Sequence, residues 1–271
     1  MTTLFLRSVS VICIEYYNMA EESWFRNWFN SPYYYRLYFK RDEEEAAAFI
    51  NKLIEYLHPA PKAEMLDVAC GKGRHSIQLA NKGFTVTGID LSEDSIKEAK
   101  QNETENLTFF VHDMRLPFMI NYFDYAFNFF TSFGYFKTRR EHDNAIRTIA
   151  QSLKPGGIFV MDYLNVHYAE DHLVHKSDIK IDDVNYFITK WFDETHFYKK
   201  IIVEDECLRE PLEYTEKVAK FSMGDFTEMF AYYGLQIQEV FGDYGFNDYD
   251  VKRSPRLIMI AKKGSPDRMP Y

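Results

Sequence analysis

The feature that most constrains the fold is an alternation of short apolar runs with amphipathic helical segments along the middle of the chain. The apolar runs lie at residues 65–69, 85–89, 107–111, 123–129 and 158–162. Strands that are apolar on both sides are typical of a parallel sheet that helices cover on both faces. We therefore predict an α/β fold with a doubly wound, mainly parallel sheet.

The end of the chain departs from this alternation. Ser222 is placed to cap a helix that ends at Gly234, and apolar runs then follow at residues 235–241 and 256–261 with no helix between them. Two strands that lack a helical crossover either pair antiparallel or lie apart. We expect a sheet of seven strands that ends in an antiparallel hairpin.

A further segment interrupts this core between the fifth strand and the last helix. Strand-forming runs lie at residues 179–181, 186–192 and 196–203, with a turn at residues 193–195. Because ligands bind at the carboxyl edge of parallel sheets, an insertion after the fifth strand falls beside that edge. We predict a small antiparallel β insertion that stands over it.

Charge and cysteine content narrow the function classes. The net charge is −9, with 32 basic against 41 acidic residues, so a face that neutralises phosphates is not expected and nucleic acid is disfavoured as a partner. The 3 cysteines are far apart and form no metal-ligand spacing, which fits a reducing, cytoplasmic setting without a metal. The apolar run at residues 4–14 contains Arg7 and is too short to cross a membrane, so no membrane partner is expected.

A glycine turn follows the first strand and leads into a helix. Gly71 and Gly73 permit a tight turn and the close approach of a ligand to the backbone, beside the positively polarised start of the helix. Asp90 ends the next strand, where a carboxylate can accept hydrogen bonds from ribose hydroxyls. A dinucleotide site needs glycine where Ser76 stands, and a phosphate-binding loop needs Ser or Thr after Lys72.

The third possible cofactor is S-adenosylmethionine (SAM). Residues 66–76 (LDVACGKGRHS) resemble the first motif of class I SAM-dependent methyltransferases, and residues 111–114 (VHDM) and 153–157 (LKPGG) resemble later motifs of that family. The resemblance implies that Asp67, Ala69, Gly71, Gly73 and Asn128 lie near the amino acid end of SAM. It further implies that Asp90 holds the ribose, that Leu91 and Met114 pack on the adenine, and that Asp113 contacts the adenine amino group.

The methyl acceptor is predicted from what surrounds these motifs. Methyltransferases that act on amino groups of DNA or glutamine carry Asn/Asp-Pro-Pro-Tyr/Phe at the end of the fourth strand. This chain has no proline after Asn128, so a small-molecule N or O nucleophile is favoured. The catalytic residue is unknown, with Tyr163 and His167 as weak candidates and His75 as a further histidine near the glycine turn. Candidate substrate-binding residues are Tyr34, Tyr38, Phe133, Asn165 and His167. The tyrosines before the first long helix, Tyr34 and Tyr38 among them, are arranged in a way that resembles the N-terminal lid of N-methyltransferases that act on amino sugars or glycine.

These expectations divide the chain into segments. We expect a non-native or disordered extension at residues 1–18, an N-terminal lid and helix at 19–62, a SAM-binding core at 63–163, a substrate-lid insertion at 164–221, the completion of the core at 222–263 and a tail at 264–271. The expected function is methyl transfer from SAM to a small molecule. The alternatives are a SAM-binding fold without catalysis and, less favoured, an NAD-dependent oxidoreductase.

Overall fold

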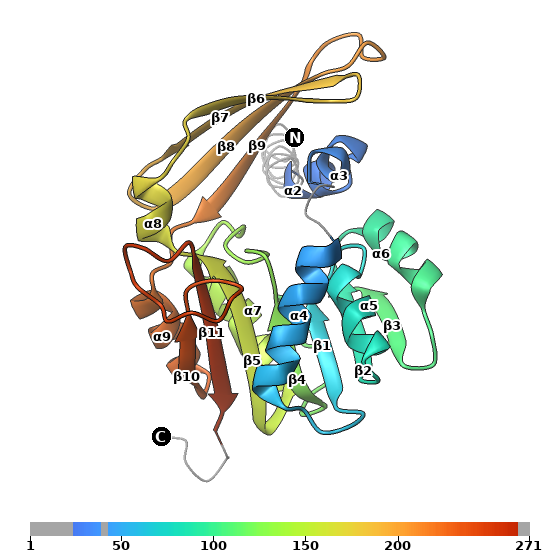
Figure 1. Cartoon of the computed structure of the whole chain (residues 1–271), viewed down its shortest axis with the longest axis vertical. Helices are drawn as coiled ribbons and strands as arrows, with labels where there is room; N and C mark the ends of the chain where they lie inside the picture. The colour runs from blue at the N-terminus through green and yellow to red at the C-terminus, as the bar shows by residue number, and fades with distance from the viewer. Residues whose placement is uncertain (1–23, 39–42, 265–271) are drawn as a thin grey trace, which may run out of the picture.

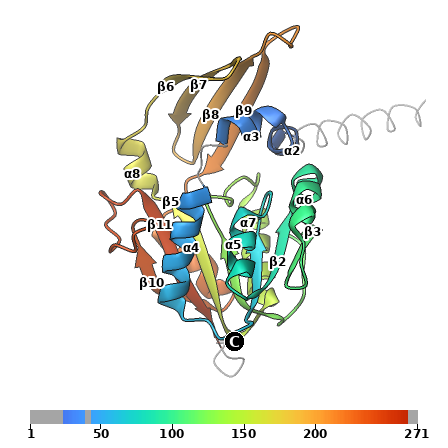
Figure 2. The same cartoon turned by 45° about the vertical axis from the view of Figure 1, so that its right-hand side comes forward.

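The computed structural model describes residues 24–38 and 43–264. The expected extension at residues 1–18 and all but the first residue of the expected tail lie outside these ranges. Within them, two sheets are formed, one of seven strands and one of four. Figures 1 and 2 show the smaller sheet above the larger one, on the side of the helices α2 (Trp24–Phe29) and α3 (Pro32–Tyr38).

The larger sheet has the strand order β10-β11-β5-β4-β1-β2-β3. Its parallel strands are β1 (Glu64–Val68), β2 (Thr85–Asp90), β3 (Leu107–Val111), β4 (Phe123–Asn128) and β5 (Leu153–Leu164). The chain ends in β10 (Leu235–Phe241) and β11 (Arg256–Lys263), and β11 is antiparallel to both of its neighbours. The predicted seven-stranded sheet with a terminal antiparallel hairpin is confirmed.

Helices cover both faces of this sheet and create two apolar clusters. On one face, α4 (Glu43–Leu57), α5 (Arg74–Asn81) and α6 (Glu93–Ala99) contribute to a cluster that includes Leu53 and Leu79. On the other, α7 (Arg139–Ser152) and α9 (Met223–Tyr232) contribute to a cluster that includes Ile146 and Phe230. A short 3-10 helix, η1 (Lys100–Asn102), follows α6. The sheet is therefore doubly wound, as predicted.

The fifth strand begins earlier than the sequence pattern indicates. Leu153 already pairs with Phe123 of β4, whereas the next pairing joins Tyr125 to Ile158. The extra residues of β5 contain Gly156, whose φ of 79° lets the backbone leave the ladder and return. The expected strand at residues 158–162 is therefore the second part of a bulged strand.

The smaller sheet, called the second sheet below, is an antiparallel meander. It follows the short helix α8 (Val166–Asp171) and consists of β6 (Lys176–Ile181), β7 (Val184–Phe192), β8 (His196–Glu204) and β9 (Leu212–Ala219) in that order. The sequence pattern predicted three of these strands and missed β9. The reason is the position of Glu216, which interrupts the apolar alternation on the covered side of β9.

Candidate active site

A cavity of about 700 Å³ lies between the carboxyl edge of the larger sheet and the second sheet. The larger sheet contributes residues from the loops after β1, β2, β3 and β4, and the other side is formed by α3 and by β7, β8 and β9. The six predicted cofactor residues that line it are Ala69, Gly71, Asp90, Leu91, Asp113 and Met114. Residues from distant parts of the chain thus meet in a single cavity.

The turn after β1 leaves open space at Gly71. Both Ala69 and Gly71 have a positive φ, 60° and 56°, and the N–H of Gly71 donates to Oδ2 of Asp90 at 2.8 Å. A Cβ placed on Gly71 would meet no atom within 4 Å. A ligand can therefore approach the backbone here without displacing a side chain.

Asp90 presents a fixed carboxylate to the cavity. Its second oxygen, Oδ1, accepts from the N–H of Ser92 at 2.8 Å, and Ser92 is the N-cap of α6. Burial raises the pKa of Asp90, and the N–H groups of Ser92 and Gly71 act in the opposite direction. Each oxygen has a second lone pair, so this carboxylate can accept hydrogen bonds from ligand hydroxyl groups.

Three predicted cofactor residues lie behind the cavity surface: Asp67, Gly73 and Asn128. A Cβ on Gly73 would lie 2.4 Å from the ring of Phe109, so the missing side chain serves packing rather than an open approach. The amide of Asn128 donates to the carbonyl of Val68 at 3.0 Å, and its Oδ1 has no hydrogen-bond partner among the described residues. These positions support the turn from below.

The carboxyl group of Asp67 is buried beneath the turn. It accepts a hydrogen bond of 2.6 Å from the hydroxyl of Ser76, the residue at the position where a dinucleotide site needs glycine. Burial raises the pKa of Asp67 to about 7, although the hydrogen bond from Ser76 opposes this shift. Asp67 therefore acts through the turn and does not reach the cavity.

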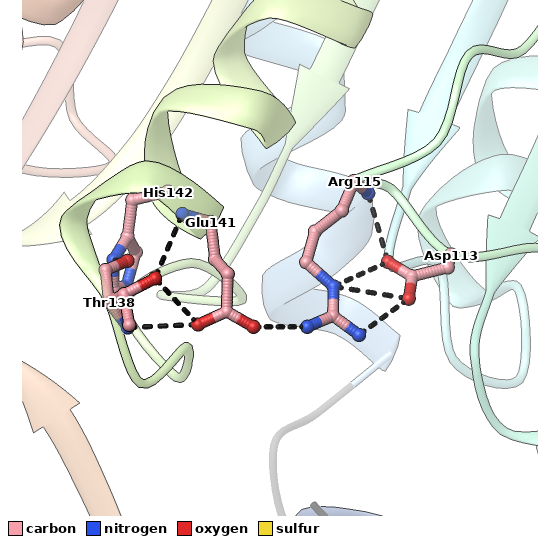
Figure 3. Close-up of polar contacts among 5 residues, drawn as sticks. All are labelled: Asp113, Arg115, Thr138, Glu141 and His142. Carbon is pink, nitrogen blue, oxygen red and sulfur yellow. Dashed lines mark hydrogen bonds and ion pairs between the residues drawn. The ribbon is translucent and has the colours of Figure 1, made fainter.

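Asp113 belongs to a charged network that ties the loop after β3 to α7 (Figure 3). Arg115 donates to Asp113 from Nε and Nη2, at 3.1 and 2.7 Å, and from Nη1 to Glu141 at 2.6 Å. Glu141 also closes the capping box of α7 with Thr138. Burial of Asp113 opposes its charge, but the contacts with Arg115 outweigh it and lower the pKa of Asp113. Asp113 is thereby held as an anion at the cavity wall.

Most candidates predicted for catalysis or substrate binding do not reach the cavity. Tyr163 is fully buried and donates its hydroxyl to the carbonyl of Ala219, and burial raises its pKa far above the usual value. Phe133 is also fully buried, in the cluster under α7 and α9. His167 is exposed on α8. These residues are not part of the cavity lining, because the side chains of Tyr163 and Phe133 pack in the core and that of His167 lies on the exposed surface of α8.

Asn165 and His75 are likewise accounted for by packing. Asn165 caps α8 and donates to the carbonyls of Val251 and Ser254 at 2.9 and 2.8 Å. His75 stacks on Phe130, and burial lowers its pKa to about 3, so the ring is neutral. Neither residue lines the cavity.

The N-terminal tyrosines do lie where the sequence places them. Tyr34 and Tyr38, both on α3, line the cavity. The hydroxyl of Tyr38 donates to Glu216 at 2.7 Å, and burial raises the pKa of Tyr38 well above the usual value. Tyr38 therefore joins α3 to the second sheet as a neutral phenol.

Two groups of charged residues in the cavity lining were missed by the sequence interpretation. One consists of Lys190, Lys199 and Glu216 from the second sheet. The other is Arg256, whose Nε donates to the fully buried Asp162 at 2.7 Å and whose Nη2 donates to Thr131 at 2.9 Å. Lys190, Lys199 and Glu216 come together through the register of the neighbouring strands β7, β8 and β9, whereas Arg256 depends on the pairing of β11 with the distant β5. No local sequence motif indicates either arrangement.

Two kinds of site are not found in the part of the chain that the structure describes. No cluster of three or more His, Cys, Asp or Glu side chains with the geometry of a metal site is formed by residues 24–38 and 43–264. None of the helices in these ranges is long and apolar enough to cross a membrane.

The chain matches known methyltransferases in sequence and in fold. A family model described as a methyltransferase domain matches residues 60–231. The putative methyltransferase YqeM of Bacillus subtilis (strain 168) is 28% identical over 222 residues, which cover 74% of this chain and 85% of that protein. The dTDP-3-amino-3,4,6-trideoxy-alpha-D-glucopyranose N,N-dimethyltransferase of Streptomyces venezuelae is 31% identical over 122 residues, 45% of this chain and 51% of that enzyme.

A solved structure agrees with these matches. An S-adenosylmethionine-dependent methyltransferase from Clostridium acetobutylicum ATCC 824 superimposes with a TM-score of 0.70, at 18% identity, over 93% of this chain and 100% of that one. The family model spans more than half of the chain. The chain therefore belongs to the methyltransferase-domain family and is a SAM-dependent methyltransferase.

Proposed function

We propose that this enzyme transfers the methyl group of SAM to a nitrogen or oxygen of a small molecule held between the larger sheet and the second sheet. The observation that carries the proposal is that one cavity of about 700 Å³ is lined at once by Gly71 and Asp90 and, from the other side, by Tyr38 and Glu216. This volume lies within the range of about 300–1,000 Å³ typical of small-molecule sites.

The larger sheet offers groups that match the parts of SAM. The carboxylate of Asp90 is suited to the ribose hydroxyls, Asp113 and Met114 to the adenine, and the open space beside Gly71 to the methionine end. The unpartnered Oδ1 of Asn128 is a buried acceptor beneath the same turn. Bound SAM supplies an electrophilic methyl group on a sulfonium. The residues present therefore fit the cofactor.

The second sheet supports a small acceptor. Because α3 and β7–β9 lie above the carboxyl edge of the larger sheet (Figure 2) and line the cavity, a bulky nucleic acid duplex or a protein loop would have to displace them. The relative from Streptomyces venezuelae is named for dimethylating the amino group of a nucleotide-linked amino sugar. The net charge of −9 also disfavours nucleic acid. Among small acceptors, an amine is the first choice.

The role of the protein in this reaction is to orient the acceptor and to exclude water. Methyl transfer is a displacement in line with the breaking bond, so holding nucleophile and methyl group together supplies much of the rate. A base is needed only for an acceptor that arrives protonated. Since Tyr163 and His167 lie outside the cavity, neither is retained as a base.

The proposal is tested by a substrate panel. The full chain is incubated with SAM and, separately, with small primary amines, amino sugars, alcohols, bulk tRNA and duplex DNA, and the release of S-adenosylhomocysteine is measured. We expect turnover on a small molecule, at least tenfold above the rate on either nucleic acid. Preferential methylation of tRNA or DNA would contradict the small-molecule assignment.

A further inference from the structure

The covered face of the second sheet contains an unusual row of charges. In β7, β8 and β9 the residues on this face are mostly apolar and pack under α2 and α3, among them Ile188, Ile201 and Tyr214. Lys190, Lys199 and Glu216 continue the same face by the two-residue period of a strand. Charged side chains are rare at covered positions unless they are paired or bind a ligand.

These three residues stand directly beside one another. Lys190 pairs with Lys199 across β7 and β8, and Lys199 pairs with Glu216 across β8 and β9. Their side chains all line the cavity. Two like charges directly opposite each other destabilise a sheet. The row therefore places a second lysine where it opposes folding unless a negative charge balances it.

Glu216 balances only one of the two lysines. Its Oε1 accepts from Nε1 of Trp28 and from the hydroxyl of Tyr38, both at 2.7 Å, and its Oε2 lies 4.0 Å from Nζ of Lys199. The side chains of Lys199 and Glu216 are only 17% and 11% exposed. Nζ of Lys199 also donates to the hydroxyl of Tyr38, so Glu216 and Tyr38 together hold Lys199 at the cavity wall.

Lys190 has no such partner. Among the residues that the structure describes, no acidic side chain forms an ion pair with it, whereas Lys200, on the opposite face of β8, pairs with Glu213 at 2.7 Å. The row therefore carries one positive charge in excess, facing the cavity. It lies on the wall opposite Asp90 and Gly71, the residues matched to the cofactor.

We propose that Lys190 and Lys199 bind an anionic group, a carboxylate or a phosphate, on the methyl acceptor. The substrate class is then a small molecule with a nucleophilic nitrogen or oxygen at one end and an anion at the other. Glu216 acts as a positioning residue that holds Lys199. This inference rests on the proposed function, since it assigns the second sheet to the acceptor.

The test measures anion binding directly. The full chain is saturated with S-adenosylhomocysteine, so that the amino acid carboxylate of the cofactor is already in place, and the binding of inorganic phosphate and of acetate is measured by equilibrium dialysis. We expect one saturable site for one or both anions, and the tighter of the two identifies the acceptor group. Lys190→Met and Lys199→Met should each weaken this binding about tenfold or more. Lys200→Met is the matched control and should leave it unchanged.

Calorimetry with SAM shows whether the lysines bind the anion of the acceptor or the carboxylate of the cofactor. If the lysines serve the acceptor, the affinity for SAM stays within twofold of the wild type in all three variants. A tenfold loss of SAM affinity in Lys190→Met would assign the lysines to the cofactor carboxylate and overturn the inference. So would the absence of anion binding in the wild type, or binding that survives both substitutions.

The substrate panel keeps this result apart from the proposed function. Turnover on neutral amines without any anion site would leave the small-molecule assignment intact and contradict the inference. A lysine-dependent anion site in an enzyme that prefers nucleic acid would support the anion site and contradict the small-molecule assignment.

Discussion

The two sheets that enclose the cavity place their charges differently. In the larger sheet, the carboxylates of Asp67 and Asp90 lie next to and at the carboxyl ends of their strands, and the strand interiors are mostly apolar. In the second sheet, Lys199 and Glu216 lie in the middle of their strands, on a face that is otherwise mostly apolar. The larger sheet thus presents its charges at strand ends and in loops, whereas the second sheet presents them on the face of the sheet itself.

This difference suggests a division of tasks. In the larger sheet, the loops at the strand ends carry the residues matched to the cofactor, and the strands below them serve only the packing of the core. A row of charges across a sheet face changes with single substitutions on separate strands, so it is suited to setting the acceptor. Under our proposal, substitutions in the second sheet would therefore change the acceptor without disturbing the cofactor residues of the larger sheet.

The largest expected effect concerns the turn of the larger sheet. In Gly73→Ala the new Cβ would lie 2.4 Å from the ring of Phe109, and the alanine would have to adopt a φ of 80°. Overpacking and a left-handed backbone together cost about 2–4 kcal/mol of unfolding free energy. Urea denaturation measures this loss.

Gly71→Ala is the matched control for that loss. Gly71 has a similar φ of 56° but open space around it, so only the backbone cost of about 1–2 kcal/mol is expected. Equal losses at the two glycines would show that Gly73 is not a packing position.

The second prediction uses the buried carboxyl group of Asp67. Its pKa is raised to about 7, so between about pH 4 and pH 7 the folded chain binds a proton that the unfolded chain has released. Wild-type stability relative to Asp67→Asn should then fall as pH rises, by about 1.4 kcal/mol per pH unit, and level off above pH 7.

Denaturation of both proteins without cofactor, at intervals of half a pH unit, measures this difference. Asn retains the size of Asp and can still accept from Ser76, which keeps the two structures comparable. A difference in stability that does not change with pH would mean that Asp67 is not desolvated in the folded chain.

The larger sheet was predictable because its signals are local. Apolar runs of strand length, the glycine turn at Gly71 and the caps at Ser92 and Ser222 each depend on a few adjacent residues. The loops that carry Asp90 and Asp113 follow from the ends of those strands. Local patterns therefore led to the fold, the cofactor and one wall of the cavity.

The other wall could not be predicted because it depends on register. Lys190, Lys199 and Glu216 are ordinary charged residues in the sequence, and only the pairing of β7, β8 and β9 brings them into one row. The candidates chosen by proximity to the end of β5, Tyr163 and His167, lie outside the cavity because the chain turns them into the core and onto the surface of α8. Nearness along the sequence did not indicate nearness to the cavity.

The central claim is that the cofactor binds to the larger sheet and the acceptor to the second sheet. Its most direct test is calorimetry of SAM binding to two variants, one from each wall of the cavity. Asp90→Ala removes a charged acceptor worth about 1.5–3 kcal/mol per hydrogen bond, so SAM affinity should fall about tenfold to a hundredfold. Glu216→Gln retains an oxygen for Trp28 and Tyr38 and should bind SAM within twofold of the wild type. Wild-type affinity in a folded Asp90→Ala protein, or an equal loss in Glu216→Gln, would contradict the claim.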